Sequence, residues 1–403
     1  MRRPILLAAS WYREGGYARV TGEILAPLAQ RWQVHYLGFD YQGAPHDRRG
    51  MRVHPAPRGP WHLADALEDL NAALRPDVLF LVHDLHIVAA CAERARRFLH
   101  RPFTVGSFPV EGRISDGGWV QSLASLDRLA VPTSFARREV ERHLPPAKSG
   151  HLAVVPYGID SRCFRPLTAA GDRQRCRLAR SLLFPDRPEL QSGFWVLNAN
   201  ALSPRKRLGT TLWGFAEFAR DKPPDVRLCL PGLWVGSGEA EELLGLAHRL
   251  GLARRLIPRP ATGGGELLDD ASLNLLYNAC EVGVNTSSGE GWGLASFEHA
   301  AAGAAQVVPD HSSPGELWRG AAELLAARGS DDVLKGLFET SPVSAGDLGA
   351  VLQRLYADPH RLQRTSLAAY ERAVGGQAWT WGDVSRRFET FFQEAASHDL
   401  HAA

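Results

Sequence analysis

Two carboxylates, Glu290 and Glu298, stand eight positions apart in the stretch GEGWGLASFEH. The residues before them, EVGVNTSS, predict a buried strand and a loop, and the alanine-rich run after them predicts a helix. Glu290 is therefore expected in the loop and Glu298 in the first turns of the helix. The alternative is that Glu298 only caps or solvates the helix and that Glu290 lies on the surface of the loop.

Glycines at positions 289, 291 and 293 let the backbone of this loop approach a ligand closely. The N–H groups of residues 291–295 would open the helix, and such a helix start favours an anion. Two acids beside an anion site are costly unless they accept protons from hydroxyl groups, such as those of a sugar or a ribose. The pattern therefore indicates a polyhydroxylated anion, such as a nucleotide sugar, as the ligand.

A basic cluster, Arg205-Lys206-Arg207, follows the predicted strand FWVLNAN and precedes a predicted helix. Only four of the 46 basic residues of the chain are lysines, so Lys206 stands out. Cations at a helix N-terminus lose a few tenths of a kcal/mol of dipole energy, and an anionic ligand would compensate for that loss. The alternative interpretation is a solvated basic turn.

Gly15 and Gly16 lie between the first predicted strand and the first predicted helix, in SWYREGGYARV. The spacing is not that of G-x-G-x-x-G, which counts against a nicotinamide or flavin cofactor. The pair fits either an ordinary turn with positive φ or a backbone cradle for a diphosphate.

Apolar runs and amphipathic helices alternate twice along the chain. The first series, within the first 160 residues, contains PILLAAS, VHYLGF, VLFLVH, FTVGSF, RLAVPTS and LAVVPYG as strands. The second series begins near residue 195 with FWVLNAN, VRLCLPG, RLIPRP, EVGVNTS and AQVVPD. Each series predicts a doubly wound α/β domain, and ligands of such sheets bind at the carboxyl ends of the strands. The proline-punctuated stretch between them is interpreted as a linker with its own helix.

Length and composition agree with two globular domains. The chain has 403 residues, 45% of them apolar, and a formal net charge of +2, which argues against a general nucleic-acid-binding surface. Its five cysteines form no C-x-x-C pair, so neither a zinc site nor a disulfide framework is expected. No apolar run is long enough to cross a bilayer, and the apolar N-terminus fits a first strand better than a signal peptide.

Taken together, these stretches resemble the retaining glycosyltransferases of family four. The most specific element is the E-x7-E pattern from Glu290 to Glu298, supported by SPRKRL, VPYGIDSRCFRP, LNLLYNACEVGVNTS and the early Gly-Gly. Their order and spacing cover nearly the whole chain. The resemblance implies the GT-B fold: an α/β fold of two Rossmann-like, doubly wound domains that face a central cleft. We expect an acceptor-binding domain at 1–166, a nucleotide-sugar-binding domain at 167–380, and a C-terminal helix at 381–403 that packs back toward the first domain.

The resemblance also implies roles for individual residues. Glu298 would bind the donor ribose, and Glu290 would lie against the transferred sugar. Lys206, with Arg205 as its partner, would neutralise the leaving diphosphate. The family's usual arginine, five positions before its lysine, is Ala201 here; the alternatives are that Arg205 or Arg207 replaces it, or that the donor phosphates are held less tightly. The remaining donor-binding candidates act through the backbone near the phosphates and are Gly291, Trp292, Gly293, Leu294, Gly15 and Gly16.

The expected reaction is a transfer of a sugar from a nucleoside-diphosphate sugar to an acceptor hydroxyl, with retention, by front-face displacement. The resemblance implies no metal and no cofactor, and a cytoplasmic enzyme. The acceptor is expected to be a small hydrophilic molecule, a secondary metabolite or a polysaccharide. The alternatives are a nucleotide-sugar epimerase or a non-catalytic nucleotide-sugar-binding protein on the same fold. Membrane contact is less favoured, nucleic acid is not expected, and the sequence predicts no oligomeric state.

The acceptor side is expected in the first domain, on loops that follow two of its strands. LVHDLHIV offers His83 and Asp84, and SFPVEGRISDGGW offers Glu111 and Trp119. For His83 and for the neighbouring His86, the alternative is a hydrogen-bonded structural histidine. A metal site at these histidines is not expected, because no further cluster of ligands accompanies them.

Overall fold

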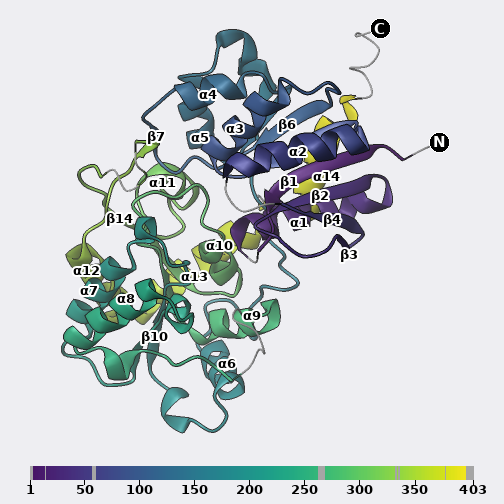
Figure 1. Ribbon diagram of the computed structural model, residues 1–403. Helices are drawn as coiled ribbons and strands as arrows, with labels where there is room; N and C mark the ends of the chain where they lie inside the picture. Colours follow the sequence, from purple (N-terminus) through teal and green to yellow (C-terminus); the bar gives the residue numbers. More distant parts are fainter. Residues whose placement is uncertain are drawn as a thin grey trace. The chain divides into compact units, whose positions relative to one another are not determined.

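The computed structural model describes residues 3–13, 15–56, 60–261, 268–331, 334, 336–376 and 378–395. The chain divides into two compact units, one of Met1–Gly158 with Trp379–Ala403 and one of Ile159–Ala378 (Figure 1). The second unit thus begins eight residues before the expected boundary at 166/167. The segment from Ile159 joins this unit because backbone atoms of Arg165 bond to two asparagine side chains of helix α9 (Asp270–Ala279): its N–H donates to Asn274 at 3.1 Å, and its carbonyl accepts from Asn278 at 2.9 Å.

The first unit is an α/β unit whose elements alternate as the sequence predicts. Its strands are β1 (Ile5–Trp11), β2 (Gln33–Phe39), β3 (His46–Arg48), β4 (Met51–Pro55), β5 (Val78–Val82), β6 (Phe103–Ser107), β7 (Arg113–Ile114), β8 (Arg128–Val131) and β9 (Leu152–Val154). Its helices are α1 (Gly16–Leu25), η1 (Ala26–Gln30), α2 (Pro60–Leu74), α3 (Leu85–Ala95), α4 (Gly118–Leu123), α5 (Ser134–Glu141), η2 (Pro146–His151) and α14 (Trp381–Gln393).

Eight of these strands form one sheet, in the order β3-β4-β2-β1-β5-β6-β8-β9. All neighbouring strands run parallel except β3 and β4. The central strands β5 and β6 are buried along their whole length, as expected for apolar runs without alternation. Parallel pairing brings the carboxyl ends of β1, β5 and β6 to the same edge of the sheet, where the acceptor-side candidates follow.

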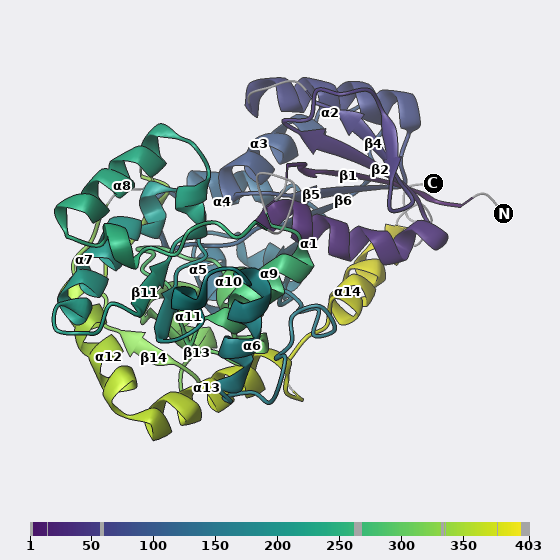
Figure 2. The same ribbon diagram turned by 90° about the horizontal axis from the view of Figure 1, so that it is seen from below.

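Helix α14 belongs to the first unit, as the sequence predicts, and lies beside α1 (Figure 2). It begins with a capping box in which Thr380 and Asp383 satisfy each other's backbone N–H groups. The rings of Phe388 and Phe392 lie 4.9 and 5.1 Å from that of Phe80 on β5. These aromatic contacts attach the end of the chain to the first sheet. The expected helix extended to 403, and residues 396–403 lie outside the described part of the chain.

The second unit repeats the α/β architecture. Its strands are β10 (Phe194–Leu197), β11 (Val226–Cys229), β12 (Val282–Val284), β13 (Ala305–Pro309), β14 (Glu323–Leu325) and β15 (Phe338–Glu339). Its helices are α6 (Gln174–Leu183), η3 (Pro188–Leu190), η4 (Pro204–Lys206), α7 (Leu208–Ala219), η5 (Pro231–Trp234), α8 (Gly238–Arg249), η6 (Ala253–Arg255), α9, α10 (Leu294–Ala301), α11 (Ser312–Leu317), α12 (Ala345–Ala357) and α13 (Pro359–Val374).

Five strands form the parallel sheet of the second unit, in the order β11-β10-β12-β13-β14. The loops after β10, β12 and β13 therefore leave the same edge of the sheet next to one another. The sequence predicts a strand at RLIPRP, where the structure has none, and does not predict β14. Leu256 of that stretch makes only an isolated parallel bridge to Leu228, since Pro258 and Pro260 follow it and cannot donate to a ladder.

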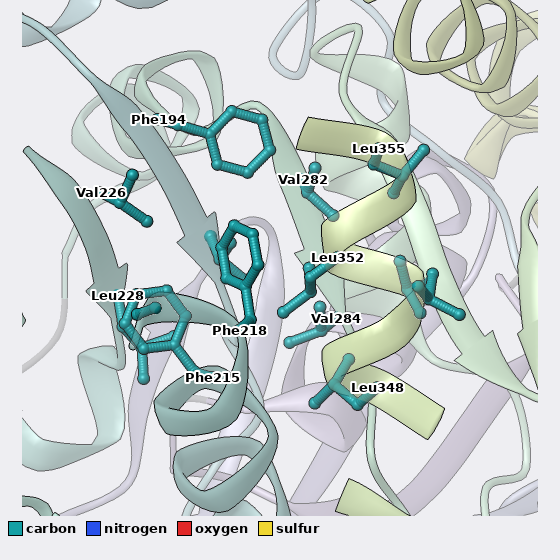
Figure 3. Packing of buried hydrophobic residues seen from close by; sticks show 14 of the residues in the cluster. Phe194, Phe215, Phe218, Val226, Leu228, Val282, Val284, Leu348, Leu352 and Leu355 are labelled. Atoms are coloured by element: carbon teal, nitrogen blue, oxygen red, sulfur yellow. The ribbon is translucent and has the colours of Figure 1, made fainter. Parts of the chain in front are cut away.

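The core of this unit lies between its sheet and helices α7 and α12 (Figure 3). Leucines 348, 352 and 355 of α12 lie one or two turns apart and point toward the strand residues Val282 and Val284. Helices α7 and α12 approach closely at two glycines: a Cβ on Gly214 would lie 2.8 Å from the carbonyl oxygen of Ala345. Any larger residue there would force the helices apart.

The stretch interpreted as a linker packs into the second unit. Arg175 and Arg180 of α6 are buried, and both donate to backbone carbonyls at the end of α9 and after it. Arg180 also binds the buried carboxylate of Glu281 at 2.7 Å and stacks over Trp195 at 4.3 Å. The stretch has the helix that the sequence predicts, and its arginines are buried because backbone carbonyls and one buried acid provide partners for them.

Candidate functional site

The candidate site of the second unit lies at the carboxyl edge of its sheet. β10 leads into the loop with Arg205 and Lys206, and β12 leads into the loop with Glu290. The two strands pair in parallel through Val196 and Val282, so their loops are neighbours. The basic residues lie on the short turn η4 and not on helix α7, which starts two residues after Lys206.

Glu290 is the centre of this site. Its side chain accepts from Lys206 Nζ and lies 3.6 Å from Arg205 Nη1. Asn285 Nδ2 and Ser287 Oγ each lie 3.4 Å from its Oε2. The residue is only 6% exposed, so the interpretation of Glu290 as a loop surface residue is wrong.

Electrostatics keep the Glu290 carboxylate ionised. Burial alone would raise its pKa, but the positive charges of Lys206 and Arg205 and the hydrogen bonds from Lys206 and Asn285 outweigh it and lower the pKa to about 2. Glu290 therefore carries a full negative charge near neutral pH and cannot act as a proton donor there. Lys206 and Arg205 together carry two positive charges and Glu290 carries one negative charge, so the group has a net charge of +1 that attracts an anionic ligand.

Glu298 lies in the first turns of α10, as expected. It is 6% exposed, so it is not a solvated helix residue either. Tyr277, on α9, donates its hydroxyl to Glu298 Oε2 at 2.8 Å. The tyrosine ring stacks on His299 with 5.4 Å between ring centroids, which fixes the tyrosine and the helix against each other.

The loop between the two acids takes the conformation that its glycines permit. Gly293 has φ +92° and is the N-cap of α10, a left-handed conformation that a residue with a side chain adopts at a cost. Gly291 is buried, and the backbone of Leu294 begins the helix. The ring of Trp292 stacks on Phe297 at 4.8 Å, so this side chain packs locally while its backbone faces the helix start.

The structure distinguishes the two arginines that were candidates to replace the one missing at Ala201. Arg205 donates to the carbonyl of Gly289 at 2.5 Å and stays beside Glu290. Arg207 has φ +51° and pairs with Asp331 instead. Arg205 is therefore the arginine that the fold brings to Lys206 and Glu290.

The candidates of the first unit form two small groups. Tyr17 donates its hydroxyl to Asp84, and its ring stacks on His83 at 4.8 Å. His83 Nδ1 accepts from the N–H of Asp84 at 2.7 Å, as a structural histidine would. Gly15 and Gly16 begin the helix that carries Tyr17.

The second group contains Trp119, which is 37% exposed, and His86, with 6.2 Å between their ring centroids. His86 Nδ1 is buried, and no hydrogen-bond partner lies near it among the described residues. Burial lowers the pKa of His86, so the ring is neutral near pH 7. Glu111 is buried. The burial of Tyr17 raises the pKa of that tyrosine well above its ordinary value, and the negative charges of Asp84 and Glu111 raise it further.

Several contributors to these sites are not among the residues that the sequence singles out. They are Tyr17, Tyr277, Asn285, Ser287, His311 and Ser312. Tyr277 is 21 residues from the acid it binds, and only the packing of α9 against α10 brings the two together. Asn285 and Ser287 lie in the predicted loop, so polar residues after a strand were the available clue.

Within the described residues, no group of three His, Cys, Asp or Glu side chains is arranged to hold a metal ion. None of the described helices combines the length and the apolar character needed to cross a membrane.

Comparison with known proteins identifies the class. No family model matches the chain. Over 98% of its length the chain superposes on sucrose-phosphate synthase from Thermosynechococcus elongatus, covering 100% of that chain with a TM-score of 0.75 and 16% identity. It also superposes on Anabaena HepE in complex with UDP and glucose, over 98% of this chain and 100% of that one, with a TM-score of 0.69 and 16% identity. The chain therefore has the GT-B fold, and the predicted fold class is confirmed.

Sequence similarity places the chain more narrowly. It is 31% identical, over 234 residues, to a D-inositol 3-phosphate glycosyltransferase of Acidothermus cellulolyticus. The match covers 57% of this chain and 46% of the relative, so it spans about half the length of that protein. The chain thus has the fold of the GT-B glycosyltransferases and is similar in sequence to one glycosyltransferase over part of its length, which supports the resemblance.

Proposed function

We propose that this chain transfers a sugar from a nucleoside-diphosphate sugar to an acceptor hydroxyl with retention of anomeric configuration. The observation that carries the proposal is the group of Lys206, Arg205 and Glu290 beside the N-terminus of α10. Positive charge and helix amides suit a diphosphate, and buried carboxylates suit the hydroxyl groups of a sugar and a ribose.

Lys206 and Arg205 stabilise the charge that grows on the leaving diphosphate as the glycosidic bond breaks. Both side chains are held by Glu290 and by the carbonyl of Gly289 before a donor arrives. Preorganised donors of this kind supply the largest part of many transition-state stabilisations, because they need no reorganisation during the reaction. Backbone N–H groups are proposed to add to the positive potential at the diphosphate. They are those of Gly291, Trp292, Gly293 and Leu294 in the second unit and of Gly15 and Gly16 in the first.

Glu290 is proposed to bind hydroxyls of the transferred sugar and to favour positive charge at the anomeric carbon. With a pKa lowered to about 2, its carboxylate is a weak base. The acceptor proton therefore goes to an oxygen of the departing phosphate on the same face of the sugar. The acceptor oxygen bonds to the anomeric carbon as the bond to the phosphate oxygen breaks, which retains the configuration. No metal or cofactor is required in this scheme.

The donor is proposed to be a UDP-sugar, since HepE binds UDP and glucose and shares the fold. Glu298, held by Tyr277, is the group proposed to bind the donor ribose. A small polyhydroxylated acceptor is proposed, because the D-inositol 3-phosphate glycosyltransferase to which the chain is similar is named for one. Glu111, Asp84 and Trp119 of the first unit remain the proposed acceptor contacts, whereas His83 is proposed to hold Tyr17 and the backbone of Asp84 in place.

Thermal denaturation with UDP, GDP, ADP or dTDP, each with and without EDTA, tests the donor site. We expect one nucleotide, UDP first, to raise the melting temperature, with no effect of chelation. NMR of the product formed from the matching sugar nucleotide and an inositol phosphate then reports the anomeric configuration. A melting temperature raised only by a nicotinamide cofactor, or an inverted product, would overturn the proposal.

The same preparation distinguishes an enzyme from a binding protein. An enzyme of this class slowly hydrolyses the donor when acceptor is absent, because water takes the place of the hydroxyl. Release of UDP above the no-enzyme rate is therefore expected. Binding of UDP without any release over many hours would favour the non-catalytic alternative.

A further inference from the structure

The loop that carries Glu290 is held from outside through its backbone. Each carbonyl from Ser287 to Glu290 accepts a hydrogen bond from another segment of the second unit. The donors are, in order, His311 Nε2 at 2.8 Å, the N–H of Ser341 at 2.8 Å, Arg205 Nη1 at 2.5 Å and Ser312 Oγ at 3.2 Å. A loop whose successive carbonyls are all bonded cannot shift without breaking several bonds at once.

Two of these four donors come from adjacent residues, His311 and Ser312. They follow β13, the strand next to β12 in the sheet, so the sheet order places them beside the Glu290 loop. His311 Nδ1 lies 2.7 Å from Ser312 Oγ, which links the two side chains to each other. Together they bind the first and the last carbonyl of the segment Ser287–Glu290.

The proton positions follow from the chemistry of the partners. A carbonyl only accepts, so His311 Nε2 carries the proton that binds Ser287. Burial lowers the pKa of His311, although the Ser287 carbonyl and the nearby carboxylates of Glu290, Asp310 and Asp331 oppose this shift. A neutral ring then presents the Nδ1 lone pair to Ser312, so the single hydroxyl proton of Ser312 is shared between Nδ1 and the Glu290 carbonyl in a three-centre hydrogen bond.

Ser312 adopts an uncommon backbone conformation at this point. Its φ is +42°, in the left-handed region that glycine adopts without strain. Such a conformation strains a residue with a side chain, and strained residues of this kind cluster at active sites and ligand clamps. Glycine would remove the strain but would also remove the hydroxyl that reaches Glu290.

We propose that His311 and Ser312 are positioning residues that fix the Glu290 loop, and thereby the Glu290 carboxylate, against Lys206 and Arg205. The inference rests on the proposed function, because it assigns the two residues to the reaction that Glu290 serves. They act through the loop backbone: their bonds go to the carbonyls of Ser287 and Glu290. Without this clamp, the carboxylate would sample positions away from the two cations.

The test uses the whole chain and five variants. His311→Ala removes the bond to Ser287 and the contact to Ser312, whereas His311→Gln keeps an N–H donor that can reach the Ser287 carbonyl. Ser312→Ala and Ser312→Gly both remove the hydroxyl, but only the glycine variant also relieves the strain. His248→Ala, at an exposed position of α8, is the matched control. Amide hydrogen exchange of the peptide 285–297 is measured for each, together with kcat and the donor KM.

We expect His311→Ala to speed exchange in this peptide and to lower kcat roughly tenfold, the scale of one or two hydrogen bonds. His311→Gln is expected to restore most of both, and the donor KM is expected to change less than kcat. Ser312→Gly is expected to be at least as stable to heat as the wild type and yet slower, which a merely structural serine would not produce. His248→Ala should match the wild type in every measurement.

The outcomes separate this inference from the proposed function. Unchanged exchange in the peptide 285–297 of His311→Ala would overturn the clamp, whatever the activity. Faster exchange with kcat equal to that of the wild type would show that the clamp does not position Glu290 for catalysis and would overturn the inference as well. A wild-type protein that transfers no sugar would defeat the proposed function, while the exchange result would still decide whether the clamp exists.

Discussion

The candidate residues of the two units differ in how they are held. In the second unit, Lys206 and Arg205 both contact Glu290. The loop that carries Glu290 accepts a hydrogen bond at every carbonyl from Ser287 to Glu290. In the first unit the candidates form separate groups, one around His83 and one around the half-exposed Trp119. This difference fits the proposal that the second unit holds the donor diphosphate in a rigid site and that the first unit contributes the acceptor contacts.

Loss of the lysine should show the largest effect. Lys206→Met is expected to lower kcat by about two to three orders of magnitude, because a preorganised cation at the leaving group is worth roughly 3 to 4 kcal/mol. Steady-state kinetics with the UDP-sugar measures it, with Lys148→Ala of the first unit as the control. Near-wild-type turnover would show that the group of Lys206, Arg205 and Glu290 has a structural role only.

The stability of the fold should report the charge on Glu290. Its pKa is lowered to about 2 in the folded chain, against about 4.3 when unfolded, so the ionised form stabilises the fold by about 3 kcal/mol. This contribution is complete above about pH 4.3 and is lost as the pH falls toward 2. Urea unfolding of wild type and Glu290→Gln should therefore differ at pH 7, differ by about half as much near pH 3, and converge at about pH 2.

The exposed acid Glu242 supplies the control for that experiment, since Glu242→Gln should follow the wild type at every pH. If the gap between wild type and Glu290→Gln stayed constant between pH 7 and pH 3, the ion pairs of the site would not be the source of its stability.

The donor ribose site should show an intermediate effect. Glu298→Gln is expected to raise the donor KM by roughly tenfold or more, because hydrogen bonds to a charged group contribute about 1.5 to 3 kcal/mol. Tyr277→Phe, which removes the hydroxyl that holds Glu298, should raise it by less. Isothermal titration with UDP gives the same comparison without catalysis, and equal UDP affinities in all three proteins would exclude Glu298 from the nucleotide site.

The smallest effects are expected in the first unit, where they test which side chains contact the acceptor. Trp119→Ala should raise the acceptor KM several-fold, on the scale of about 1 kcal/mol for an exposed aromatic contact, and leave donor hydrolysis unchanged. His83→Ala should instead lower the melting temperature, because His83 holds Tyr17 and the backbone of Asp84. A reversal of these two results would mean that the His83 imidazole itself, and not Trp119, contacts the acceptor.

Much of the fold was predictable because its signals are local. Apolar runs without alternation, as in Val78–Val82 and Phe103–Ser107, predicted buried parallel strands, and both are buried throughout. Strand β14 was missed because Glu323–Leu325 is only three residues long and begins with a charge. The unit boundary was placed too late, since the bonds that tie Arg165 to α9 join residues more than a hundred positions apart.

The features of the candidate site also fall into those that local sequence predicts and those that depend on distant residues. Glycines and charges after a strand marked Lys206, Glu290 and Glu298, because an anion site needs these residue types close together along the chain. The burial of both acids was not predictable, since it depends on partners such as Tyr277 that lie far away in the sequence. His311 and Ser312 carried no signal, as neither residue type is unusual after a strand.

The sequence by itself determined the two α/β units and the loop that holds Glu290, because hydrophobic periodicity and glycine placement act over a few residues. Only the tertiary structure decided that Arg205 and not Arg207 reaches Glu290, and that His311 and Ser312 hold its loop. The physical reason is the strand order of the second sheet. β10, β12 and β13 are neighbours there, although long connections separate them along the chain, and parallel pairing brings their three loops together.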